Sequence, residues 1–245
     1  MNLHLKNQSQ NNNKKSNSQV ELIDKLHTEW KDCLRCPLHV TRTQTVFGTG
    51  NTVNPKIFIV GQSPGEIEDR EGKPFVGKDS WHLNAAMEKA GISRANDCYI
   101  TNSVICRPWI PHTSRNFPPS VTSIESCRNR LLLEYEIVKN TIDVIVLVGK
   151  EAHITWLRHN DFSNPSFNSD MFKIRIKDVI GWNKSTSNLD ETVNNKMIYT
   201  VYHPSYIARQ GDTQLALDWL NDWIAISKFV FNKEIESPRG SNNNV

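Results

Sequence analysis

Four short, almost wholly apolar runs constrain the fold of this chain more than any other feature of its sequence. Each is typical of a strand that is buried on both faces. The runs cover residues 56–61, 98–105, 143–149 and 197–204. Helical patterns over 81–92 and 124–139 alternate with them, and a long amphipathic pattern over 214–231 follows the last run. This alternation predicts an α/β fold: a three-layer α/β/α domain with a mostly parallel, four-stranded central sheet.

The two ends of the 245-residue chain differ in composition from its middle. Residues 1–19 are rich in Asn, Gln, Ser and Lys, with too few apolar side chains to offset the entropy lost on ordering. Residues 234–245 have the same character. We therefore expect disordered tails at both ends and one ordered domain over 20–233. Within it, residues 158–196 fit the alternation poorly, and only 172–180 resembles a strand.

Net charge and hydropathy limit the expected location and binding partners of the protein. The formal net charge of +3 leans only weakly towards polyanions and does not indicate nucleic acid by itself. No apolar run approaches the roughly 18 residues of a membrane span, and the N-terminus lacks the apolar core of a signal peptide. We expect a cytoplasmic protein that does not bind membranes.

Three of the four apolar runs lead directly into polar or Gly/Pro-rich segments. These segments read GQSPGE (61–66), NSVICRPW (102–109) and HPSYIAR (203–209). In mostly parallel sheets, ligands bind beyond the carboxyl ends of the strands. The three segments are therefore predicted to converge on one site.

Five cysteines are present, and without a signal peptide an odd number argues against a disulfide scaffold. Cys33 and Cys36 form a C-x2-C pair whose tight turn can direct both sulfurs to one metal. Cys106 and Cys127 supply two further thiolates, and four thiolates satisfy either Zn²⁺ or an iron–sulfur cluster. One close pair with two distant single cysteines favours the cluster, with zinc as the alternative. Cys98 opens an apolar run and is expected in the core.

The order of several motifs resembles one known family. The C-x2-C pair is followed by GQSPGEIEDREGKPFVG (61–77), YITNSVICRP (99–108) and YHPSYIAR (202–209). Over roughly residues 20–230 this order resembles the iron–sulfur uracil-DNA glycosylases, called family 4. The resemblance implies a structural [4Fe–4S] cluster on the four cysteines named above. It also implies an enzyme that flips a pyrimidine nucleotide out of DNA and hydrolyses its N-glycosidic bond, leaving an abasic site.

The resemblance also implies roles for residues near the strand ends. Phe75 would stack on the flipped base, Asn102 would read its edge, and His203 would donate a hydrogen bond to the base oxygen as negative charge develops. Further catalytic candidates are Gln62, Glu68 and Asp69, and Glu66 lies beside them. Further candidates for binding the base are Ser63, Gly65, Asp79 and His82. Candidates for contacts with DNA phosphates are Arg107, Arg115, Ser205 and Arg209, and candidate wedges are Trp109, Ile110 and Phe117.

The chain departs from the family pattern beside the expected pocket. Gln62 stands where members of the family usually have Glu, and Ser63 where they have Ala or Gly. KDSWHL (78–83) replaces a run of small, apolar residues. These departures leave three hypotheses for the function of a monomeric protein that binds DNA. The protein could excise uracil or an analogue, or it could excise a bulky modified pyrimidine in anti-phage defence. As a third possibility, it could bind or crosslink DNA without turnover.

Overall fold

A computed structural model describes residues 18–113, 115–157, 175–183 and 196–232 of the chain. Its centre is a six-stranded sheet with the order β1-β3-β2-β4-β6-β5. The strands are β1 (Thr49–Gly50), β2 (Ile57–Gly61), β3 (Cys98–Asn102), β4 (Val144–Val148), β5 (Gly181–Asn183) and β6 (Met197–Val201). The middle four run parallel, whereas β1 and β5 pair antiparallel at the edges. The expected fold class and its four parallel strands are confirmed, and the two short edge strands are additions.

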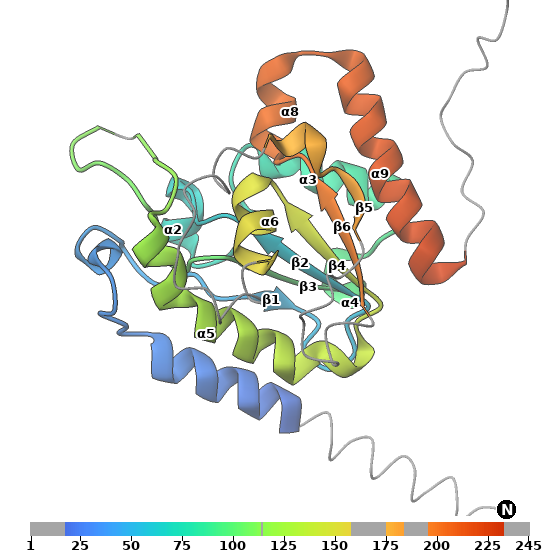
Figure 1. Ribbon diagram of the computed structural model, residues 1–245. Coiled ribbons are helices and arrows are strands. Elements are labelled where there is room, and N and C mark those ends of the chain that lie inside the picture. Colours follow the sequence, from blue (N-terminus) through green and yellow to red (C-terminus); the bar gives the residue numbers. More distant parts are fainter. Residues whose placement is uncertain (1–17, 114, 158–174, 184–195, 233–245) are drawn as a thin grey trace, which may run out of the picture.

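Helices cover both faces of the sheet (Figure 1). One face carries a helix over residues 18–30 together with α5 and α6, and the other carries α3, α8 and α9. The longer helices are α3 (Ser80–Lys89), α5 (Val121–Val138), α6 (Lys150–Leu157), α8 (Pro204–Gln210) and α9 (Thr213–Phe231). The short ones are α2 (Glu66–Glu71), α4 (Arg94–Asp97) and the 3₁₀ turns η1 (Pro37–Val40), η2 (Lys139–Thr141) and η5 (Ile176–Asp178). No described helix is both long and apolar enough to cross a membrane.

Strand β2 shows why the sequence fixes the layers. Ile57 and Ile59 face the core shared with α3 and α9, whereas Phe58 and Val60 face the core shared with α5 and α6. Side chains of a strand alternate between the two faces of its sheet, so a continuous apolar run must be covered on both. Each fully buried side chain of this size contributes roughly 1.5–3 kcal/mol. This burial holds the carboxyl end of β2 at a fixed place.

The described part of the chain opens in a helix at residue 18, and Gln19 donates a hydrogen bond from Nε2 to the carbonyl of Ile137 at 3.0 Å. Of the strand expected over 172–180, residues 172–174 lie outside the described residues. Residues 176–178 form a 3₁₀ turn, and the strand β5 follows at 181–183. Residues 1–17 and 233–245, and most of 158–196, lie outside the described residues.

Between the neighbouring strands β2 and β4, the connections to the next strands leave in opposite directions. From β2 the chain passes to β3 on one side, and from β4 it passes through α6 towards β6 on the other. Neighbouring strands whose connections leave in opposite directions open a crevice at their carboxyl ends, where ligands of such sheets bind. The polar segments after β2, β3 and β6 all lie at this edge of the sheet.

Candidate active site

The carboxyl ends of the strands border a cavity of about 860 Å³. It is lined by the loop after β2, helix α2, the segment leading into α3, the end of β3, residues 116–118 and the start of α8. Pockets of roughly 300–1,000 Å³ hold small ligands, so a nucleobase with its sugar fits the available space. The candidate residues that line the cavity are Gln62, Ser63, Gly65, Glu66, Glu68, Phe75, Asp79, Asn102, Phe117, His203, Ser205 and Arg209.

Phe75 lies in the wall of this cavity in an unusual backbone conformation. Its φ is 52°, in the left-handed region, and its side chain is buried. The ring centroid lies 6.2 Å from that of His203. On the other side is Gly61, where an added Cβ would lie 2.5 Å from the Phe75 ring and 2.3 Å from Asn102 Oδ1. Glycine is therefore required at the end of β2, because no side chain fits between Phe75 and Asn102.

Asn102 is the last residue of β3 and contributes its amide to the cavity. The side chain is buried, and its Nδ2 has no hydrogen-bond partner among the described residues. A buried amide without a partner costs about 1–3 kcal/mol. Such a group in the wall of a cavity is suited to bind a polar ligand.

His203 faces the cavity from the start of α8. Its Nδ1 accepts a hydrogen bond from the backbone N–H of Ser205 at 3.3 Å and lies 2.9 Å from the Ser205 hydroxyl oxygen. A backbone N–H can only donate, so Nδ1 is unprotonated and the ring proton lies on Nε2. Burial lowers the pKa of His203 to about 4, and Arg209 acts in the same direction while Asp79 opposes it. At neutral pH the ring is therefore an uncharged donor.

The four cysteines of the expected metal site pack together in an apolar cluster that includes Ile105, the neighbour of Cys106. Cys106 and Cys127 are buried and belong to the cluster, and Cys33 and Cys36 pack against it half-buried. None of the chain's cysteines forms a disulfide. Cys98 lies instead in the core beneath α3, as expected.

Two arginines contact sulfur atoms of this cluster. Arg42 Nη1 lies 3.2 Å from the sulfur of Cys106 and donates to the carbonyl of Cys33 at 2.7 Å. Arg130, which is fully buried, places Nη2 3.9 Å from the sulfur of Cys127. The guanidinium groups therefore provide positive charge where thiolate ligands would carry negative charge.

Comparison with known proteins identifies the family. The Uracil DNA glycosylase superfamily profile matches residues 47–224. The chain belongs to this superfamily. A protein named type-4 uracil-DNA glycosylase from Thermotoga maritima is 33% identical over 210 residues, which are 86% of this chain and 95% of that protein.

Two further relatives carry the same name. The one from Archaeoglobus fulgidus is 28% identical over 215 residues, 88% of this chain and 96% of the relative. The one from Pyrobaculum aerophilum is 38% identical over 117 residues, 48% of this chain and 56% of the relative. The family resemblance drawn from the motifs is confirmed.

In this uracil DNA glycosylase superfamily member, the acidic candidates of α2 separate into two groups. Glu66 and Glu68 line the cavity, whereas Asp69 is buried on another side of the helix. The Asp69 carboxylate accepts hydrogen bonds from the backbone N–H of Thr43 at 2.9 Å and of Gln44 at 3.5 Å. Asp69 therefore does not line the cavity, and its carboxylate holds residues 43–44 against α2.

His82 also differs from expectation. Asp79, which caps α3, lines the cavity, but His82 lies one turn further along and does not. The His82 ring instead contacts the exposed Trp81 edge-on at 5.1 Å. A direct contact between His82 and a bound base is therefore not supported.

The arginines expected at phosphates have different surroundings. Arg107 is buried, donates to Asn116 Oδ1 at 2.8 Å, pairs with Glu66 at 3.3 Å and lies over the Trp109 ring. These contacts leave Arg107 bracing the loop after β3, and a phosphate contact by this residue is not supported. Arg115 and Arg209 are exposed, and Arg209 borders the cavity with Ser205.

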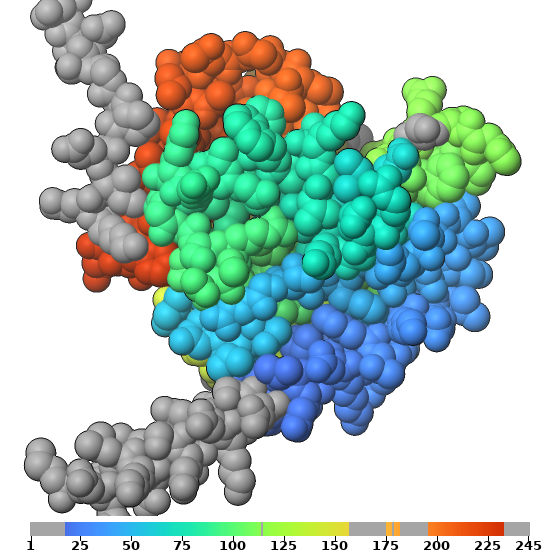
Figure 2. Space-filling view, turned by 180° about the vertical axis from the view of Figure 1, so that it is seen from behind, coloured from blue at the N-terminus to red at the C-terminus, as the bar shows by residue number. Residues whose placement is uncertain are grey.

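The segment after β3 protrudes from the body beside the residues that follow the first helix (Figure 2). Trp109 anchors it, since its Nε1 donates to the carbonyl of Thr41 at 2.7 Å. Ile110 and Phe117 are exposed by 48% and 38%, and Phe117 also lines the cavity. Trp109 is thus committed to packing, which leaves Ile110 and Phe117 as the exposed candidates for contact with DNA.

Other residues of the site were not anticipated. Lys78, Arg70 and Asn116 line the cavity, while Arg94 and Arg130 hold its walls from behind. Lys78 follows the PFVG segment directly, so its position in sequence could have indicated it. The two arginines lie on α4 and α5, and no local pattern distinguishes them from ordinary helix residues.

Proposed function

We propose that this protein is a DNA glycosylase of DNA repair that removes uracil from DNA by hydrolysing its N-glycosidic bond. The observation that carries the proposal is the buried amide of Asn102, whose Nδ2 has no partner among the described residues and borders the cavity. The names of the curated relatives support uracil as the base. They lend no support to a bulky modified pyrimidine or to DNA crosslinking.

The pocket would recognise a base that has left the duplex. Flipping costs a few kcal/mol, which stacking and hydrogen bonds to the base must recover. Phe75 offers the stacking surface, and the Asn102 amide offers one donor and one acceptor to the base edge. Uracil presents the complementary pair, a carbonyl oxygen at O4 and an N–H at N3.

Bond cleavage leaves negative charge on the base and positive charge on the sugar. His203 would donate its Nε2 proton in a hydrogen bond to the base oxygen O2, where the charge accumulates. The ring keeps this proton throughout, because Nδ1 is held as an acceptor by the N–H of Ser205. His203 thus acts as a fixed neutral donor, and loss of such a donor typically lowers kcat by about 10²–10³.

Water would attack the sugar from the side of Gln62, which lines the cavity. An amide oxygen can accept a hydrogen bond from the attacking water and orient it. It cannot take up the proton that the water releases, which would pass to solvent or to a carboxylate that lines the cavity, such as that of Glu66.

The four cysteines would hold a [4Fe–4S] cluster that supplies a structural crosslink and no reaction chemistry. Their residue types fit, and Arg42 and Arg130 compensate thiolate charge at two of them. A single zinc ion would require all four sulfurs within about 2.3 Å of it. Among the described residues, no three acidic, His or Cys side chains are arranged to hold a metal ion, so the preference for the cluster rests on the spacing of one close cysteine pair and two distant single cysteines.

The cluster can be tested by its colour. Protein purified without oxygen should be brown, absorb visible light and contain four iron atoms per chain by the cluster formula. Cys106→Ser and Cys127→Ser variants should lose this absorbance, whereas Cys98→Ser should keep it. Colourless protein with one bound zinc ion would contradict the assignment.

The function is tested by base release from matched oligonucleotides. DNA with a single uracil opposite guanine or adenine, single-stranded DNA with uracil, and DNA with cytosine or glucosylated hydroxymethylcytosine would be compared. Release of uracil alone is the expected result. Release of only the modified cytosine, or no release with a stable protein–DNA adduct, would contradict it. We also propose that the protein is a monomer located in the cytoplasm. Its molecular mass measured by analytical sedimentation would test the monomeric state.

A further inference from the structure

The backbone at Phe75 is held from two sides by charged side chains that make no part of the proposed base contacts. A bulky residue with a φ of 52° is a conformational outlier. Such conformations persist only where surrounding contacts over-determine them, and they concentrate at functional sites. The contacts that hold Phe75 are therefore of interest beyond simple packing.

Glu68 holds the segment from the side of α2. Its carboxylate accepts the backbone N–H of Gly65 at 2.5 Å, closing the first turn of the helix. The backbone N–H groups of Phe75 and Val76 also favour its charged form, which opposes the rise in its pKa that burial causes. The carboxylate thus acts on both the residue that starts α2 and the segment that supplies the stacking ring.

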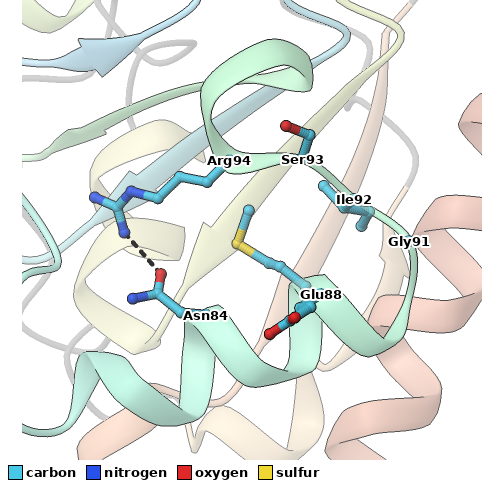
Figure 3. Close-up of a pocket in the computed structure, with 7 residues that line it drawn as sticks. Asn84, Glu88, Gly91, Ile92, Ser93 and Arg94 are labelled. Atoms are coloured by element: carbon cyan, nitrogen blue, oxygen red, sulfur yellow. Dashed lines mark hydrogen bonds between the residues drawn. The ribbon is translucent and has the colours of Figure 1, made fainter.

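Arg94 holds the same segment from the opposite side, at the start of α4. Its Nη1 donates to the carbonyl of Phe75 at 2.9 Å, and its Nη2 donates to the carbonyl of Pro74 at 2.5 Å. Nη1 also donates to Asn84 Oδ1 on α3 at 3.0 Å, which fixes the plane of the guanidinium (Figure 3). One guanidinium thus holds the carbonyls of both Pro74 and Phe75.

We propose that Glu68 and Arg94 are positioning residues that hold the ring of Phe75 ready for the base before DNA binds. This inference rests on the proposed function, in which Phe75 stacks on the flipped base. A preformed stacking surface spares the cost of ordering the segment when the base arrives. Displacement of a positioned group by about 1 Å can cost on the order of 10²-fold in rate.

A second cavity gives access to the Arg94 side of this clamp. It has a volume of about 420 Å³ and is lined by Arg94, Ser93 and Ile92 with Asn84, Met87 and Glu88 of α3 (Figure 3). An Arg94→Ala substitution would extend this cavity to the carbonyls of Pro74 and Phe75. A guanidinium ion from solution could then occupy the place of the lost side chain and restore the two hydrogen bonds.

The experiment compares wild type, Arg94→Ala, Arg94→Lys and the exposed control Lys89→Ala. Arg94→Ala should release uracil about 10- to 30-fold more slowly at subsaturating DNA, because even a small displacement of the Phe75 ring lowers the reaction rate strongly. Guanidinium chloride at tens of millimolar should restore several-fold of that loss, and equal sodium chloride should not. Arg94→Lys should lie between the two, since lysine keeps the charge without the two parallel donors.

Hydrogen exchange provides a readout that does not depend on activity. Backbone amides of residues 75–78 should exchange at least about tenfold faster in Arg94→Ala and in Glu68→Gln, while those of β2 and β4 stay protected. If wild type releases no uracil but this change appears, the proposed function fails and the clamp stands. A rate of uracil release by Arg94→Ala within twofold of wild type, or unchanged exchange at residues 75–78, would overturn the clamp. The exchange of Glu68→Gln decides the matter if Arg94→Ala does not fold.

Discussion

Two regions at the carboxyl end of β3 use polar groups in opposite ways. In the cavity, Asn102 and His203 keep donors directed at space that a ligand can fill. In the cysteine cluster, Arg42 and Arg130 direct their N–H groups to carbonyls and sulfur atoms of the protein itself. The first arrangement is suited to binding and chemistry and the second to holding the chain together. Substitutions should therefore separate into those that lower the rate and those that lower stability.

Arg130 joins the two regions. From α5 it donates to the carbonyls of Asn102 at 2.6 Å and Ser103 at 3.0 Å, and it pairs with the buried Glu134 at 2.8 Å. The same side chain contacts the sulfur of Cys127. The end of the strand that presents Asn102 is thus supported by the cation that also lies against the cysteine cluster.

Arg130→Leu should have the largest effect on stability. It leaves Glu134 buried without its partner, and breaking a buried pair this way costs about 3–5 kcal/mol. Chemical denaturation of the variant and of wild type measures the difference. The double variant Arg130→Leu/Glu134→Leu is the control and should recover most of the loss, because no unpaired charge remains. Equal loss in both would show that the charge is not the cause.

Gln62→Glu should raise the rate of base release without changing stability, the opposite pattern to Arg130→Leu. A carboxylate at this position can accept the proton of the attacking water, so base release should become about tenfold faster at pH 7. Unfolding midpoints should stay the same, since Gln62 only borders the cavity. The isosteric substitution is its own steric control, and a slower variant would refute the assignment of the water to this side.

The pH dependence of stability should show the smallest effect. His203 has a pKa of about 4 in the folded state, below its ordinary value because of burial, so the unfolded chain binds the proton first as pH falls. This contribution is fully present above pH 6.5 or so and is lost towards pH 4. When the pH falls from 7 to 5, the free energy of unfolding of His203→Gln should therefore decrease by about 1–2 kcal/mol less than that of wild type. Equal losses in acid titrations of the two proteins would contradict the pKa.

Much of the fold could be predicted because its signals are local. The apolar runs at 56–61 and 143–149 have the length and composition typical of strands covered on both faces, and α9 shows its amphipathic pattern over its whole length. Edge strand β1 has two residues, too few for any alternation to appear. Parallel strands bring their carboxyl ends together, so Gln62, Asn102 and His203 could be expected at one site.

The rest of the site depends on contacts that sequence does not display. Glu68 and Asp69 are adjacent, yet a helix turns by about 100° per residue, so one borders the cavity and the other faces residues 43–44. Arg94 contacts the carbonyl of Phe75, a residue 19 positions away, only because α4 packs beside that segment. Arg107 was assigned to DNA from its neighbours in sequence, but its burial directs it to Asn116.

The most direct test of the account pairs base release with unfolding for two variants of the cavity, Asn102→Ala and His203→Ala. Both should release uracil at least about 10²-fold more slowly than wild type, while their denaturation midpoints do not fall below the wild-type value and their visible absorbance is unchanged. Uracil release near the wild-type rate in both variants, or a loss of rate that merely follows a loss of stability, would contradict the assignment of the chemistry to this cavity.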